Sequence, residues 1–475
     1  MRKKLNWLIC LVLMVALTAC SSGEGGSGTS TSSGNGTADS MTEGSSGKSD
    51  SGDSTGKNDN TQGNSGTTEG NNDSGTKTDE GVAAVSEIMD RYAGILEDEL
   101  KWEYNSSSKT IVISGEGPMK NYIAEVPEWD VYADEAEAVV IGDKVTSVGD
   151  LAFWAFSNLQ EVKLGEDVEY IGDSAFAYCY SLRTVNFPEK LKFVGTAAFV
   201  NALLHSDKGF VLPEGLEYVG EDAFFSAFKE SYVSLPASLE NIGKEAFANC
   251  YIEEFRIDEG NKAFASVDGI MYSKDLTTLY YYPSLKTDKL YEIPDTVKTI
   301  KEYALEATRT LEKIVIPKSV SLIEEGAIYG NYALNRIDVD EANTAYKSED
   351  GVLYTRDGKK LVCYPIASER NEYTVPEGTE EIFKYSFSQA MNLEKIHIKE
   401  GVKRIGEGAF LNCDRMVSAG LPKSLETIET YGFGWCEALT RINYASSLED
   451  WEKITIGENN EILSSGIVYP EYSED

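Results

Sequence analysis

The sequence predicts a solenoid of short parallel β-strands, and two observations support that prediction. A phrase of the form (I/V)-G-x-x-A-F recurs along the chain, and most steps between its aromatic positions are 23 residues, one is 25, and two are 58 and 59. A fixed period of about 20 to 50 residues indicates one small unit stacked many times, because a single unit of that size cannot bury its own apolar face. The aromatic position falls at Phe153, Phe176, Phe199, Phe224, Phe247, Leu305, Ile328, Phe387, Phe410 and Phe433.

Each unit is predicted to contain a short strand followed by a return segment. The copy that ends at Phe199 begins L-R-T-V-N-F-P at Leu182, and its apolar and polar residues alternate at period two. That alternation is typical of a strand with one buried side, and Pro188 ends the strand because it lacks an N–H group. The return segment should place Ala198 and Phe199 in the interior through a short helical turn or a second strand. Stacked copies would then align their phenylalanines in a column.

Four of the seven cysteines share one position of the repeat, three residues after the column residue. A cysteine that recurs at one position is best explained as a small apolar residue that faces the core. The last two of the four occupy neighbouring repeats, so a disulfide between them is the alternative. The four residues are Cys179, Cys250, Cys413 and Cys436.

With these features the repeat resembles the BspA-type leucine-rich repeat family, which is widespread among secreted and surface-attached bacterial proteins. The resemblance covers residues 139–444 in ten copies and implies a β-rich leucine-rich repeat solenoid, with short parallel strands and short helical turns. Three copies depart from the pattern: Lys301-Glu302 precedes Leu305, Glu324-Glu325 precedes Ile328, and Phe383 replaces the glycine.

The two long intervals contain matching inserts, near 258–293 and 340–375. Asp268-Gly269 and Asp350-Gly351 each separate alternating apolar runs, which predicts a β-hairpin or small meander in each insert. The run 280–282 consists of three tyrosines. These form either an exposed aromatic patch or a cover over the core of the hairpin.

The solenoid needs caps at both ends, because an open end would expose its core. Residues 81–138 are predicted to be the N-terminal cap, with a helix followed by a hairpin between Trp102 and Ile113. The alternative for the helix is a role in partner binding. Residues 445–475 resemble the closing segment of the family and form the predicted C-terminal cap, with Trp451 as its lid.

The first 80 residues predict export and tethering. Three cations precede an apolar run too short to span a bilayer permanently, so residues 1–19 are expected to be a signal peptide. The run ends in L-T-A-C, which resembles a bacterial lipobox and implies lipidation of Cys20; an uncleaved anchor is the alternative. Residues 20–80 are rich in Gly, Ser and Thr, and a segment with so little apolar content is predicted to be a disordered tether.

Composition and motifs argue against several functions. A net charge of −36 repels nucleic acid and anionic lipid headgroups, so no nucleic-acid partner is expected. Only two histidines are present, so neither a Cys/His metal site nor a cofactor is expected, although a requirement for divalent cations is left open. Ser106 and Lys109 fit S-x-x-K but lie in a predicted hairpin turn, without the companion motifs of a hydrolase. The chain is therefore not expected to be an enzyme.

The predicted binding site is the outward face of the stacked strands. A cell-surface lipoprotein that binds proteins or glycans outside the cell, for adhesion or for host or microbe interaction, is the function that the family resemblance implies. Its only membrane contact would be the lipid anchor, on the extracellular face. The alternative is a surface lipoprotein that captures carbohydrates or peptides for uptake. The candidate residues are Lys163, Asn186, Ser234, Arg256, Thr374, His397 and Asn443, in one column with Val211, Val315 and Asp338.

Overall fold

The computed structural model describes residues 91–92, 95, 97–207 and 209–471, which belong to the second of the chain's two compact units, Gly75–Asp475. The predicted signal peptide, Cys20, the tether 20–80 and the cap residues 81–90 lie outside the described residues. Within the described part, no helix is long and apolar enough to span a membrane.

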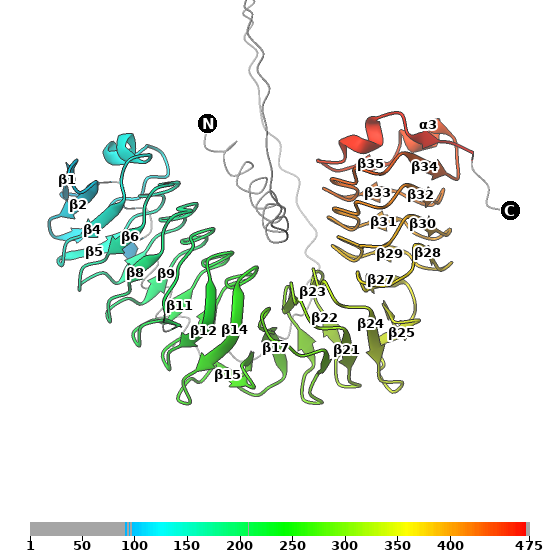
Figure 1. Ribbon diagram of the computed structural model, residues 1–475, viewed down its shortest axis with the longest axis horizontal. Helices are drawn as coiled ribbons and strands as arrows, with labels where there is room; N and C mark the ends of the chain where they lie inside the picture. The colour runs from blue at the N-terminus through cyan, green and yellow to red at the C-terminus, as the bar shows by residue number, and fades with distance from the viewer. Residues whose placement is uncertain (1–90, 93–94, 96, 208, 472–475) are drawn as a thin grey trace, which may run out of the picture. The chain divides into compact units, whose positions relative to one another are not determined.

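Each regular turn of the solenoid contains two strands, and each strand pairs in parallel with the equivalent strand of the next turn (Figure 1). The first strands of the turns form four sheets, in which β1 and β2 pair antiparallel and all other neighbours pair parallel. The strands are β1 (Lys101–Asn105), β2 (Thr110–Ser114), β4 (Ala138–Ile141), β6 (Glu161–Lys163) and β8 (Thr184–Asn186); then β10 (Phe210–Val211), β12 (Lys229–Leu235) and β14 (Tyr251–Ile257); then β18 (Leu290–Glu292), β21 (Lys313–Ile316) and β24 (Arg336–Val339); then β28 (Glu372–Val375), β30 (Lys395–Ile398), β32 (Ser418–Leu421), β34 (Arg441–Tyr444) and β36 (Val468–Tyr469).

The return segments form a second set of sheets from shorter strands, most of them two residues long. The sequence left open a helical turn or a second strand; the structure has a short second strand, and in the regular copies the Ala and Phe follow it in a non-helical turn. The strands are β3 (Gly117–Pro118), β5 (Val145–Val148), β7 (Tyr170–Ile171), β9 (Phe193–Val194), β11 (Tyr218–Val219) and β13 (Asn241–Ile242); then β17 (Thr278–Tyr281), β19 (Thr299–Ile300) and β22 (Leu322–Ile323); then β27 (Lys360–Cys363), β29 (Glu381–Ile382), β31 (Arg404–Ile405), β33 (Thr427–Ile428) and β35 (Thr455–Ile456); and the pair β20 (Leu305–Glu306) and β23 (Ile328–Tyr329).

In the repeats that carry a column residue, the chain turns sharply around that residue after the second strand. We call this turn the corner, and its backbone conformation is not that of a helix. The residues two before and two after the column residue adopt positive φ, as Ser174 (54°) and Tyr178 (62°) do around Phe176. Left-handed residues at this spacing interrupt a right-handed helix. The corner is instead held to the next turn by backbone bonds, such as Phe153 N–H to the Ala175 carbonyl at 2.9 Å.

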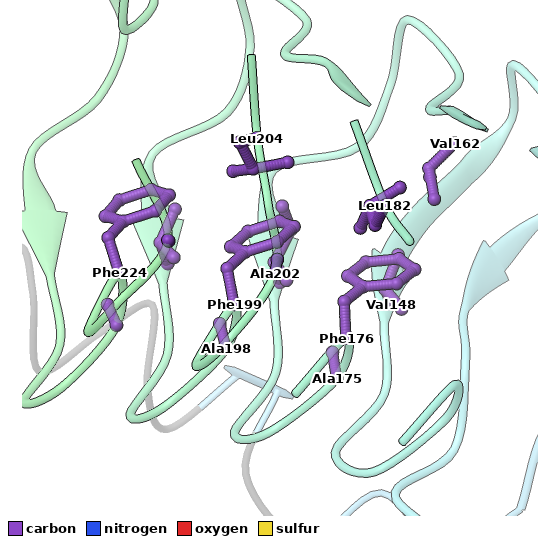
Figure 2. Packing of buried hydrophobic residues seen from close by; sticks show 14 of the residues in the cluster. Val148, Val162, Ala175, Phe176, Leu182, Ala198, Phe199, Ala202, Leu204 and Phe224 are labelled. Carbon is purple, nitrogen blue, oxygen red and sulfur yellow. The ribbon is translucent and has the colours of Figure 1, made fainter. Parts of the chain in front are cut away.

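The phenylalanine column is confirmed. Phe153, Phe176, Phe199 and Phe224 are fully buried, and successive rings stack with centroids 5.4 Å apart. Figure 2 shows three of these rings, Phe176, Phe199 and Phe224, repeating along the stack, with Ala175 beside Phe176 and Ala198 beside Phe199. The column resumes at Phe387, Phe410 and Phe433, with 4.9 Å between ring centroids. Each ring stacks on the equivalent ring of the next turn. The regular spacing of the phenylalanines in the sequence therefore produces a regular stack of rings in the core.

The recurrent cysteines are buried free thiols, as the filler interpretation predicted. The Cys179 thiol donates to the Phe153 carbonyl at 3.2 Å, and the Cys436 thiol donates to the Phe410 carbonyl at 2.9 Å. Cys250 and Cys413 make the equivalent bonds. The disulfide alternative for the last pair is not what the structure has, because Cys413 and Cys436 are both free.

Both inserts contain the predicted hairpins. In the first, β15 (Phe264–Val267) pairs antiparallel with β16 (Ile270–Ser273), and in the second, β25 (Tyr346–Glu349) pairs with β26 (Val352–Thr355). Asp268 and Gly269 both have positive φ in the first connection, which is the geometry that an Asp-Gly turn favours. A third strand completes each meander and then pairs parallel with the solenoid, β17 with β19 and β27 with β29.

The inserts divide the described solenoid into three blocks. Neither set of sheets continues across an insert: β13 and β14 end their sheets before the first, and β22 and β24 end theirs before the second. The main core separates in the same way into three clusters of buried side chains. Across the inserts the sheet ladders are replaced by single backbone bonds, such as Leu285 N–H to the Ile252 carbonyl at 3.0 Å and Ala367 N–H to the Leu334 carbonyl at 2.9 Å, and by side-chain contacts.

An aromatic residue covers the N-terminal end of the column. At the N-terminal end, η1 (Glu128–Tyr132) places Trp129 on Phe153, with ring centroids 5.6 Å apart, and its indole N–H donates to the Ala152 carbonyl. At the C-terminal end, α3 (Leu448–Trp451) precedes η2 (Glu461–Ser464). Trp451 packs edge-on against Tyr444 at 5.3 Å.

Candidate binding face

The structure brings the candidate residues together in four separate groups. The column is interrupted where one sheet ends and the next begins, because β8 does not pair with β10 and both inserts break the ladder. The four groups are Lys163 and Asn186; Val211, Ser234 and Arg256; Val315 and Asp338; and Thr374, His397 and Asn443, the last two separated by Gly420.

Lys163, Asn186, Arg256 and Thr374 are the exposed polar members of the column. The Arg256 guanidinium lies 3.5 Å from the centre of the Tyr232 ring and pairs with Glu254. Stacking on an aromatic ring orients a guanidinium while its donors stay accessible, and arginine and tyrosine are favoured at protein interfaces. Arg256 on Tyr232 is therefore the best ordered contact point on this face.

Three candidates are held by intramolecular contacts. The Asn186 side-chain amide accepts the Leu164 N–H at 2.7 Å and donates to the Leu164 carbonyl at 3.0 Å. Asn443 is only 9% exposed and accepts from Arg441 Nε at 2.6 Å. The His397 ring nitrogen Nε2 lies 3.0 Å from a Glu372 oxygen. These contacts position the strand face, and they limit what these three side chains can offer to a partner.

The described residues were predicted to include neither a metal site nor a nucleophile pair, and two observations bear on those expectations. Among the described residues, no group of three or more His, Cys, Asp or Glu side chains is placed to hold a metal ion. Ser106 and Lys109 lie in the turn between β1 and β2, and the Lys109 ammonium pairs with Glu137. The tyrosine run does not form an exposed patch, since Tyr281 and Tyr282 are buried.

Sequence reasoning missed a polar cavity at the first insert. Glu306 is 6% exposed, and its carboxylate accepts the Asn249 N–H at 2.7 Å across the insert. Burial, with a smaller contribution from the charge of Glu245, raises the pKa of Glu306 to about 8. The cavity beside this carboxyl has room of about 20 Å³ for water-sized groups and is lined partly by Tyr281, Tyr282 and Tyr303. A signal was present in the sequence: the residue after the column position is apolar in most copies, and Glu306 is an exception.

A second feature that sequence reasoning missed is an ionic bridge between the blocks. Glu302 binds Lys244, which precedes the first insert, at 2.6 Å, and Lys384, which follows the second, at 3.1 Å. Arg404 likewise reaches Glu325 across the second insert at 3.4 Å. The partners are 58, 82 and 79 residues apart, so no local pattern could have revealed them.

Comparison with known families agrees with this architecture. A model of the BspA type leucine-rich repeat region, six copies long, matches residues 119–208, 205–287, 277–350 and 367–464. The chain belongs to the BspA-type leucine-rich repeat family. No curated protein is significantly similar to this leucine-rich repeat protein.

Solved structures agree with the fold of this leucine-rich repeat protein. A leucine-rich repeat protein from Eubacterium ventriosum is 21% identical, with a TM-score of 0.54, over 80% of this chain and 95% of that chain. A leucine-rich cell surface protein from Faecalibacterium prausnitzii is 22% identical over 76% of this chain and 97% of that chain, with a TM-score of 0.47. The first match supports the fold, a leucine-rich repeat solenoid of mostly parallel strands with little helix. Solenoids of this kind are generally binding proteins rather than enzymes.

Proposed function

We propose that this protein is a lipid-anchored surface protein that binds proteins or glycans outside the cell, through the strand face of its solenoid. The observation that carries the proposal is the set of exposed side chains at paired positions, above all Arg256 ordered on Tyr232. A rigid sheet that repeats such positions offers a partner a pre-organised surface, which lowers the entropy lost on binding.

The N-terminal sequence supports the surface location. The apolar run before Cys20 is typical of an export signal, and a lipid on the Cys20 thiol would retain the protein at the membrane. If Cys20 is the anchor, Cys20→Ala should release the protein into the medium of the producing cell, and the wild type should carry lipid on its N-terminal peptide. An unmodified N-terminal peptide from the membrane fraction would contradict the anchor.

A binding screen tests the strand face. The purified chain is applied to immobilised matrix proteins, mucins and a glycan array, beside a variant with Lys163→Ala, Arg256→Ala and Thr374→Ala. The control variant, Lys190→Ala with Arg415→Ala, removes two exposed cations that pair with Asp167 and Glu394 away from the strand column. Loss of roughly tenfold or more in affinity for a protein or large glycan, in the first variant alone, is expected, since a few central contacts dominate an interface.

Other outcomes separate the alternatives. Equal loss in both variants would indicate non-specific charge effects, and unchanged binding in both would place the contact off the strand face. Binding restricted to short glycans or peptides would favour a capture protein that serves uptake.

A further inference from the structure

The first insert interrupts a hydrogen-bond pattern that most other corners keep. In regular turns, the N–H two residues after the column residue donates to a backbone carbonyl of the next turn, as Tyr178 does to Val200 at 2.7 Å. After Phe247 the next turn along the chain belongs to the insert. The Asn249 N–H donates instead to the Glu306 carboxylate, and the Phe247 N–H to the Tyr281 hydroxyl at 3.4 Å.

Glu306 is the exceptional residue at this junction. The equivalent positions in neighbouring repeats are Ala177, Val200 and Ala248, which are small or apolar. No lysine, arginine or histidine of the described chain forms an ion pair with Glu306, although its side chain is almost fully buried. A buried carboxyl group without a cation is costly unless it stays protonated or a cation reaches it.

The cavity beside Glu306 suits a small cation. Its volume corresponds to about one or two water-sized groups, and aromatic rings of Tyr281, Tyr282 and Tyr303 contribute to its walls. The titratable groups that interact electrostatically with Glu306 are all acids. They are Glu245, Cys250, Tyr281, Tyr303 and Tyr329.

We propose that this cavity binds a small ammonium group, as free ammonium or as the end of a short primary amine, with Glu306 as the acceptor of its N–H bonds. An ammonium donates charge-assisted hydrogen bonds to a carboxylate and is attracted to the faces of aromatic rings. The site lies at the insert junction and does not depend on the proposed function of the strand face.

Methylammonium chloride is the probe, titrated into the full chain by isothermal calorimetry, with sodium chloride and tetramethylammonium chloride as controls. Saturable binding of methylammonium is expected, and neither control ion should compete with it. Sodium lacks N–H donors, and tetramethylammonium is too large for a cavity of about 20 Å³.

Glu306→Gln tests the role of the carboxylate. Glutamine keeps an acceptor for the Asn249 N–H but removes the charge, so the affinity should fall at least tenfold. The matched control is Glu324→Gln, because Glu324 also accepts a backbone N–H, that of Glu302 at 2.9 Å, but does not line the cavity. Equal affinity in wild type and Glu306→Gln would overturn the proposal.

The pH dependence of the wild type tests the same site without a substitution. Protons and the ammonium group compete for Glu306, whose pKa burial raises to about 8. Binding should therefore tighten between about pH 6.5 and about pH 8.5, while an amine with a pKa near that of lysine stays protonated. Proton release, measured in buffers of different ionisation enthalpy, should accompany binding at the lower pH. Absence of saturable binding at both pH values would also overturn the proposal.

Discussion

At the scale of single residues, many acidic side chains of this chain act as structural acceptors. The Asp150 carboxylate accepts the Asp173 N–H, and the Asp173 carboxylate accepts the Thr196 N–H, both at 2.8 Å. Burial raises the pKa of Asp150 to about 6, with a further contribution from the nearby charge of Asp173. Part of the acidic composition therefore satisfies backbone donors at the corners, and net charge alone overstates the acidity of the surface.

Phe176→Ala tests the column. The ring is fully buried and stacks on Phe153 and Phe199, so the substitution should lower the free energy of unfolding by about 3 to 5 kcal/mol. Urea unfolding followed by circular dichroism measures the change. Val211→Ala is the control, since that side chain is 61% exposed and should change stability by less than about 0.5 kcal/mol. Equal stability of the two variants would show that the column is not the core.

At the scale of elements, the two Asp-Gly connections determine how each insert leaves the solenoid. Gly269 has φ +76°, and a Cβ there would lie 2.7 Å from Glu254 Cβ on β14. Gly351 in the second insert has φ +85°, and its nearest neighbour is Arg336 on β24. In both inserts the hairpin turn packs closely against the preceding solenoid strand, β14 in the first insert and β24 in the second. This close approach explains why a residue without a side chain occurs there.

Gly269→Ala should destabilise the first insert for two reasons, positive φ and the close contact with Glu254. The expected cost is about 2 to 4 kcal/mol, against about 1 kcal/mol for Gly378→Ala, where φ is +91° but a Cβ would meet nothing within 4 Å. Thermal unfolding of both variants measures the difference. If the two costs were the same, backbone strain alone would account for both, and the contact with β14 would have no role.

At the scale of the whole described solenoid, side-chain contacts add to the few backbone bonds that connect the blocks across the inserts. Glu302 is the common partner of Lys244 and Lys384, and its side chain is 10% exposed. Hydrophobic contacts also join the first block to the insert, since the Phe247 and Tyr281 rings pack edge-on at 5.9 Å. The three blocks should therefore unfold cooperatively only while these contacts persist.

Glu302→Gln should weaken the connection between the blocks. The half-exposed Lys244 keeps its pair with Glu245, and Lys384 keeps its pair with Glu407, so loss of the Glu302 charge should cost about 1 to 2 kcal/mol. Unfolding should then show more than one transition in urea, followed by tryptophan fluorescence. Glu116→Gln breaks an exposed pair with Lys144 and should cost less than about 1 kcal/mol. A single transition in Glu302→Gln, at the wild-type midpoint, would mean that the bridge does not couple the blocks.

Local sequence was sufficient to predict the repeat, the buried phenylalanines and cysteines and the two hairpins. Each of these features depends on residues that are close together within one unit, or on the stacking of that unit on equivalent units. It also placed the candidate strand residues in a common column, although it could not show that the column is divided among four sheets. The family match agrees with the period read from those residues.

Only the tertiary structure decided what happens where the repeat is interrupted. Glu306 meets Asn249 from 57 residues away, and Lys384 meets Glu302 from 82 residues away. Tertiary contacts also decided which strand residues remain available, since Asn186 and Asn443 bond to neighbouring groups while Arg256 stays exposed. The physical reason is that a period determines contacts between successive equivalent units. Contacts across an insert join residues that are not in successive units, so they depend on how the segments on the two sides of the insert pack in three dimensions.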